Sequence, residues 1–131
     1  MSFIDTDCAN ILETFGVGTV GIDIFAGLDQ PDLPNAAILL VSTGSYQPSM
    51  PSLDYSFLTL QVTVRDSEGN KQGCDATTDT VIDILHGLVD YTQGTSRYVQ
   101  IFQNSGPISI LEDGTMRPKN IVNFYALRTT S

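Results

Sequence analysis

The most constraining feature of the sequence is a long alternating segment that starts at Leu53 or Tyr55 and ends at Asp66. Its apolar positions are Leu58, Leu60, Val62 and Val64, and its polar positions are Thr59, Gln61, Thr63 and Arg65. Alternation with a period of two predicts a β-strand that has one apolar and one polar face. At about 3.3 Å per residue, twelve residues would span roughly 40 Å, so the fold has to be organised around this strand.

Two segments carry the spacing of amphipathic helices. Residues 4–15 repeat apolar side chains every three or four positions and end at Gly16. Residues 76–91 form the main predicted helix, with Asp75 or Thr77 as its N-cap and Gln93-Gly94 as its stop signal. The sequence therefore predicts two helices, one before the long strand and one after it.

Further strands are predicted at residues 20–26 and 36–43, although the compact apolar run at 36–43 leaves a helical segment as the alternative. Three strand-like pieces close the chain, at residues 97–103, 107–111 and 120–128. Turns at Asn104-Ser105-Gly106 and at Glu112-Asp113-Gly114 would connect them as an antiparallel meander.

This order of elements predicts an α+β fold, with one mixed or antiparallel sheet flanked by the two main helices. The 131 residues suit a single domain that covers the whole chain, residues 1–131. A chain of this length can bury a core without disulfides or metals, so Cys8 and Cys74 are read as two small buried thiols. The sequence does not settle whether they form a bridge.

Charge excludes one class of function. With 15 acidic and 6 basic residues the net charge is −9, whereas ordinary nucleic-acid binding needs Lys and Arg to neutralise phosphates. No apolar run approaches the roughly 18 residues that span a bilayer, so we expect no membrane partner. The N-terminal segment has no basic region of a signal peptide, so we expect synthesis in the cytoplasm.

Two local motifs fail when their context is considered. Residues 16–21 match GxGxxG, but a dinucleotide site needs this motif between a strand and a helix, and here it follows a helix and leads into a strand. Asp66, Glu68 and Asn70 alternate like calcium ligands, but Gly69 is misplaced for an EF-hand loop and no closing Glu follows. We expect turns at both places, and no metal or cofactor.

His86 is the only histidine, so any Ser-His-Asp or Cys-His arrangement of a hydrolase would have to use it. The predicted helix places it between Asp83 and Asp90, and a His–Asp pair can orient a general base. No Ser or Cys lies beside it in sequence, and all three side chains would lie on the polar side of the helix. A solvated helix face is therefore favoured over catalysis, and no catalytic residue is predicted.

Two loops rich in Pro and Ser, at residues 27–35 and 44–52, are long for a compact domain and would suit arms that clasp a neighbouring subunit. The candidate inter-subunit residues in and beside them are Pro31, Pro34, Tyr46, Pro48, Met50 and Pro51. The aromatic side chains on the predicted strands are interpreted as core or subunit-interface residues, because no basic surface accompanies them for RNA binding.

Four segments in the C-terminal half, taken in order, resemble a known family. They are the strand segment Phe57–Asp66, the helix with Ile84-Leu85-His86-Gly87, the pair Arg97-Tyr98-Val99-Gln100-Ile101 and Gly106-Pro107-Ile108, and the closing Asn123-Phe124-Tyr125-Ala126-Leu127-Arg128. This order, over about residues 55–128, resembles the minor capsid and tail terminator proteins of siphophages, which belong to the neck between head and tail.

The resemblance implies a virion structural protein without a reaction. Such proteins form a hexameric ring on top of the tail tube, end tube polymerisation, and join the tail to head-completion proteins. The implied partners are further copies of the chain, the tail tube protein, the head-completion and neck proteins, and double-stranded DNA that passes through the ring without specific binding. An acidic channel would repel phosphates. The candidate channel acids are Asp29, Asp32, Asp54 and Asp113.

Two other interpretations remain open. Another neck component, such as a tail-to-head joining or head-completion protein, fits the same resemblance. A small cytosolic hydrolase or ligand-binding domain using His86 is the rival from a different class.

Overall fold

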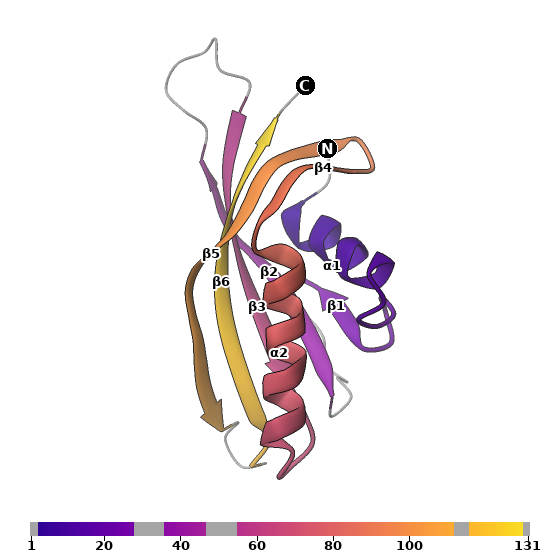
Figure 1. Ribbon diagram of the computed structural model, residues 1–131, viewed down its shortest axis with the longest axis vertical. Helices are drawn as coiled ribbons and strands as arrows, with labels where there is room; N and C mark the ends of the chain where they lie inside the picture. The colour runs from indigo at the N-terminus through magenta and orange to yellow at the C-terminus, as the bar shows by residue number, and fades with distance from the viewer. Residues whose placement is uncertain (1–2, 28–35, 47–54, 112–115, 130–131) are drawn as a thin grey trace.

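The computed structural model describes residues 3–27, 36–46, 55–111 and 116–129. The elements in chain order are α1 (Ile4–Thr14), β1 (Ile24–Ala26), β2 (Ala37–Tyr46), β3 (Tyr55–Arg65), α2 (Lys71–Leu85), β4 (Leu88–Gln93), β5 (Ser96–Leu111) and β6 (Pro118–Thr129). The strands form one curled sheet in the order β1-β2-β3-β6-β5-β4. Only β1 and β2 are parallel, so the sheet is mixed, and both helices cover the same face of it (Figure 1).

The long alternating segment is β3, and it lies inside the sheet. Its residues pair with β6 from Tyr55↔Thr129 to Arg65↔Lys119, and its other edge pairs with β2. On β3 and β6 alternate residues are buried under the helices, including Leu60, Val62 and Phe124. The strand is therefore the centre of the sheet, and neither of its edges is open to a neighbouring molecule.

Helix α1 follows the prediction closely. Its apolar stripe of Ile4, Cys8, Ile11 and Leu12 is fully buried against the sheet. Phe15, the last residue of the predicted stripe, is instead the C-cap and is exposed. Only Ile24–Ala26 of the predicted strand 20–26 is extended, because residues 16–23 form turns after the helix.

Helix α2 begins and ends five to six residues earlier than predicted. The side chain of Asn70 accepts a hydrogen bond from the N–H of Gly73 and is the N-cap, whereas the expected caps Asp75 and Thr77 lie inside the helix. The helix ends at Leu85 because Gly87 adopts a φ of 92°, a conformation that favours glycine. The apolar residues Leu88 and Val89 therefore belong to β4, and Gln93-Gly94 is part of a hairpin turn.

The predicted turn at Asn104-Ser105-Gly106 is wrong. This segment lies within β5, which joins the two predicted pieces 97–103 and 107–111 into one strand. The pairing of β5 with β6 shifts register around Ser105, so the turn-forming residues are accommodated as an irregularity within the strand. Gly106 has a φ of 94° at this point. The other predicted turn, Glu112-Asp113-Gly114, lies outside the described residues.

A buried polar cluster attaches α1 to the sheet. The hydroxyl of Tyr98 donates a hydrogen bond to the Oδ2 of Asp7 at 2.5 Å, and Nη1 of Arg128 lies 3.8 Å from the same oxygen. Burial, and then the hydrogen bond to Asp7, raise the pKa of Tyr98 above its ordinary range. The phenol therefore remains a hydrogen-bond donor at physiological pH.

We predict that Tyr98→Phe destabilises the protein by about 1–3 kcal/mol, because it removes the donor to a buried carboxylate. The measurement is the free energy of unfolding in urea. Tyr91→Phe is the matched control, since Tyr91 is only half-buried and its ring contacts Phe15. Its loss should stay within about 0.5 kcal/mol. Equal destabilisation by the two substitutions would contradict the importance of the cluster.

Candidate interaction surfaces

Most of the predicted loop residues lie outside the described part of the chain. These are Pro31, Pro34, Pro48, Met50 and Pro51, and the candidate channel acids Asp29, Asp32, Asp54 and Asp113. Tyr46 is the last residue of β2. Its backbone partner is Phe57 of β3. The assignment of all ten residues to interfaces or to a channel stays a prediction.

The GxGxxG match is a turn between α1 and β1. Gly16 and Gly21 have φ values of 83° and 90°, and the carboxylate of Asp23 accepts a hydrogen bond from the N–H of Thr19 within the same turn. The motif follows a helix and precedes a strand, as the sequence predicts. It therefore lacks the helix N-terminus that a pyrophosphate site needs.

His86 is the C-cap of α2 and not a residue within the helix, which corrects the sequence prediction. The side chain is exposed, and Nδ1 accepts a hydrogen bond from the N–H of Gln103 at 2.8 Å. This bond ties the end of the helix to β5. Neither Asp83 nor Asp90 is hydrogen-bonded to it, and Asp90 instead pairs with Arg97 across the β4–β5 hairpin. The arrangement gives His86 a structural role.

The alternating acids before α2 form a capping turn. The Oδ1 of Asp66 accepts hydrogen bonds from the N–H of Ser67 and from the side chain of Asn70, which in turn caps the helix. No group of three potential metal ligands occurs within residues 3–27, 36–46, 55–111 and 116–129. The interpretation of this segment as a polar turn is confirmed.

Both cysteines are free and fully buried, one in each helix. Burial raises the pKa of both thiols, and nearby Asp7 adds to the shift of Cys8. The Sγ of Cys74 donates to the carbonyl of Val64 at 3.3 Å. A buried thiol with a raised pKa is unreactive, so the two residues act as small core side chains.

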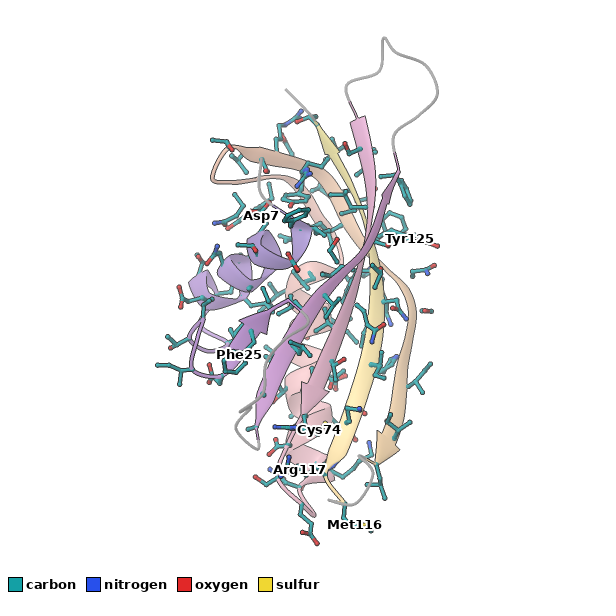
Figure 2. All side chains as sticks on the ribbon, turned by 180° about the vertical axis from the view of Figure 1, so that it is seen from behind. Asp7, Phe25, Cys74, Met116, Arg117 and Tyr125 are labelled. Atoms are coloured by element: carbon teal, nitrogen blue, oxygen red, sulfur yellow. The ribbon has the colours of Figure 1, made fainter. Side chains whose placement is uncertain are left out.

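The face of the sheet opposite the helices carries no acidic side chain on β2, β3, β5 or β6. Register pairs on this face include Gln61↔Asn123 and Arg65↔Lys119. Rings gather in one part of it, where Tyr125 lies 5.0 Å from Phe57 and 5.6 Å from Phe102 between ring centroids. Figure 2 shows this helix-free face, with Tyr125 projecting from it. The described acids therefore lie on the helices, the turns and β4.

The end of β5, residues 104–111, is an exposed edge that we call the β5 arm. Strand β4 pairs with β5 only from Ser96 to Ile101, so among the described residues the arm is paired on one side alone, by β6. Its apolar side chains Ile108, Ile110 and Leu111 are 56%, 42% and 53% exposed, and Met116 beside them is also exposed. An uncharged, apolar sheet edge is a template for association unless something covers it.

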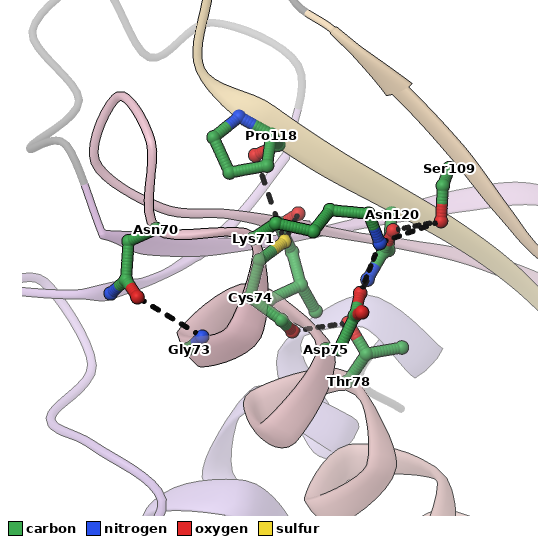
Figure 3. Close-up of polar contacts among 10 residues, drawn as sticks. Asn70, Lys71, Gly73, Cys74, Asp75, Thr78, Ser109, Pro118 and Asn120 are labelled. Atoms are coloured by element: carbon green, nitrogen blue, oxygen red, sulfur yellow. Dashed lines mark hydrogen bonds and ion pairs between the residues drawn. The ribbon is translucent and has the colours of Figure 1, made fainter.

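A polar network holds the β5 arm against α2 (Figure 3). The buried Asn120 of β6 donates from Nδ2 to Asp75 and to Thr78, both at 2.9 Å, and its Oδ1 accepts from the hydroxyl of Ser109 at 2.7 Å. The ammonium of Lys71 bonds Asp75 at 2.5 Å and reaches Ser109 at 3.3 Å. The arm is thus attached to the rest of the sheet by side chains as well as by strand pairing.

A second exposed apolar group lies at the α1–β1 corner, residues 15–23. Phe15, Val20 and Ile22 are all exposed, and the ring of Phe15 lies 6.2 Å from that of Tyr91 between ring centroids. Within the corner, the carboxylate of Glu13 accepts a hydrogen bond from the N–H of Val20, which links the end of α1 to the turn. Figure 1 shows the corner on the opposite side of the molecule from the end of β5.

Sequence reasoning missed both apolar groups, because apolar residues at strand or helix spacing were assigned to the core. The signal that was present is the uncharged run from Gln103 to Leu111, which no acid or lysine interrupts. The described part of the chain contains no helix long and apolar enough to cross a bilayer.

Comparison with known proteins gives a likeness of fold. No family model matches the sequence, and no curated protein matches it. Among solved structures, a chain from the virion of a native gene transfer agent particle has a similar fold, with a TM-score of 0.68 and 13% sequence identity. The match covers 96% of this chain and 87% of that chain. The architecture described above is therefore similar, nearly from end to end, to that of a protein within a virion.

Proposed function

We propose that this chain is a structural protein of a phage-like virion, and that within the virion it acts as a tail terminator. The observation that carries the proposal is the similarity of fold, over almost the whole chain, to a component of a gene transfer agent virion. At 13% identity this likeness concerns the fold, so the role rests on further arguments from the sequence and the exposed surfaces.

The order of motifs in the C-terminal half, which resembles the tail terminator family, supports this role. In the structure the strand segments of this pattern are neighbouring parts of one sheet, and the remaining segment is the end of α2. The alternating strand is β3, Arg97–Ile101 and Gly106–Ile108 lie in β5, and Asn123–Arg128 lies in β6. Because β3, β6 and β5 are adjacent, the resemblance covers a contiguous structural unit.

The nature of the surface also supports it. Among the described residues, the polar side chains that sequence patterns offered for chemistry serve as helix caps, turns or ties between elements. The unexplained features are instead two exposed apolar groups on different sides of the molecule. Such surfaces are typical of proteins that function by assembly.

The charge of the chain bears on the passage of DNA. A hexameric ring on a tail tube has to let double-stranded DNA pass, and a net charge of −9 disfavours binding to its phosphates. The helix-free face is neutral apart from a few bases, so an acidic channel would have to come from other segments. The acids at 29, 32, 54 and 113 remain the candidates for it.

Deletion of this gene from the particle that encodes it should produce over-long tails, because nothing then ends polymerisation of the tube. Electron microscopy of tail lengths measures this, with the intact gene supplied in trans as the control. Tails of normal length that fail to join heads would instead identify the chain as another neck component.

His86→Ala should restore normal tail length and infectivity to the deletion strain. Its exposed imidazole accepts one hydrogen bond from the N–H of Gln103, so the loss should cost stability by about 1 kcal/mol and leave assembly intact. Ser105→Ala is a matched control for a local loss of one hydrogen bond in β5. Assembled but inactive particles with His86→Ala would support the rival hydrolase.

Replacement of Asp29, Asp32, Asp54 and Asp113 together by Lys should slow DNA ejection while particles still assemble, because the channel would then attract phosphates. The rate of ejection from purified particles measures this effect. Replacement of the same acids by Asn is the control for loss of negative charge without gain of positive charge. Unchanged ejection by the Lys variant would remove these residues from the channel.

A further inference from the structure

The polar network between α2 and β6 places an amine beside an amide. The ammonium of Lys71 lies 2.5 Å from Oδ1 of Asp75, and the same oxygen accepts a hydrogen bond from Nδ2 of Asn120 at 2.9 Å. At the other end of the amide, the hydroxyl of Ser109 accepts from Nζ of Lys71 at 3.3 Å and donates to Oδ1 of Asn120 at 2.7 Å. A single atom therefore links the amine to each end of the amide group, and the carbon Cγ of Asn120 lies between those ends (Figure 3).

We propose that Lys71 and Asn120 react with each other to form an isopeptide bond, which covalently joins the first turn of α2 to β6. Aminolysis of an amide needs an amine, an amide carbon, a group that relays protons between the two nitrogens, and a donor to the amide oxygen. All four lie within this network. The modification is independent of the role in a virion proposed above.

Asp75 is the proton relay, because its carboxylate contacts both nitrogens. Hydrogen bonds from Lys71, and then from Asn120, lower the pKa of Asp75, so its side chain is ionised at neutral pH and can accept a proton. It takes a proton from the ammonium of Lys71, and the lone pair of Nζ then attacks Cγ of Asn120. Two protons in all pass from Nζ to Nδ2 through this carboxylate. The bond between Cγ and Nδ2 breaks, Nδ2 leaves as an ammonium ion, and Nζ keeps one hydrogen as the new amide N–H.

Ser109 donates to the oxygen on which negative charge develops. When Nζ attacks, Cγ becomes tetrahedral and Oδ1 of Asn120 gains charge, which strengthens the hydrogen bond from the hydroxyl of Ser109. The orientation of the amide is fixed from the other end, because Nδ2 also donates to the hydroxyl oxygen of Thr78 at 2.9 Å. Nδ2, the leaving group, is thus directed towards the relay, and Oδ1 towards the donor.

Burial favours the amine over water as the nucleophile. Asn120 is 2% exposed and Thr78 beside it is 1% exposed, so the amide is shielded from bulk water. The side chain of Lys71 is half exposed, but its hydrogen bonds to Asp75 and Ser109 hold Nζ beside the amide. A nucleophile held in this way reacts as if it were present at very high concentration. Hydrolysis of Asn120 to aspartate is therefore disfavoured relative to the cross-link.

Intact-mass spectrometry of the purified and denatured chain tests the proposal. The cross-linked chain should be lighter than its sequence mass by the mass of one ammonia molecule. A tryptic digest should contain the segment with Lys71 joined to the segment with Asn120. The full sequence mass, if it persists after prolonged incubation of the folded chain, would overturn the proposal.

Lys71→Arg keeps the positive charge but cannot form the bond, so the loss of mass should disappear. Lys119→Arg is the matched control, because Lys119 adjoins Asn120 in sequence but pairs with Ile110 on the helix-free face. This control should keep the loss of mass in full. A loss of ammonia that persists in Lys71→Arg would come from cyclisation of an asparagine, and would also overturn the proposal.

Asp75→Asn should slow formation of the bond at least about a hundredfold, because an amide cannot relay the protons. Asp79→Asn is its control, since Asp79 lines the same pocket of α2 and β6 but is exposed and stands outside the relay. The measurement is the fraction of lighter chain against time after purification. Equal fractions in the two variants would overturn the assignment of Asp75 as the relay.

Discussion

The pairing of β3 with β6 is the interaction on which the rest of the structure depends. The two strands run antiparallel in unbroken register from Tyr55↔Thr129 to Arg65↔Lys119. Residues that face each other across the pair therefore point to the same side of the sheet. One face of this ribbon is therefore mostly apolar, with Ser56, Asn120 and Arg128 as its buried polar residues, and both helices cover that same face. The polar positions of the alternating strand lie on the other face, which the helices do not cover.

The same ribbon explains where the exposed surfaces arise. Strand β5 continues along β6 well beyond the point where β4 ends, because α2 already occupies the space beneath and Asn120 ties Ser109 to it. The extra length of β5 becomes an arm with an open edge. At the opposite side, α1 ends at Thr14 with Phe15 as its C-cap, and the tight turns that follow leave Phe15 outside the core. Both surfaces are thus consequences of how the ends of elements are placed.

Much of the fold could be predicted from local patterns. Alternation identified β3, helical spacing identified α1, and the α+β class with a mixed sheet and two helices fits the structure broadly. The boundaries of α2 could not be predicted, since a cap at Asn70 and a stop at Gly87 compete with equally good signals nearby. Turn-forming residues inside β5 were misread because pairing with β6 overrides local turn preference. The candidate surfaces were not predicted, apart from the signal of the uncharged run before Leu111, because exposure of an apolar side chain depends on where neighbouring elements end.

The central proposal is that this chain is a structural protein of a phage-like virion and acts at the top of the tail tube. Electron cryomicroscopy of purified particles that contain the chain tests it most directly. The proposed role predicts density for this chain between the tail tube and the head. Density for the chain elsewhere in the particle, or its absence from purified particles, would contradict the account.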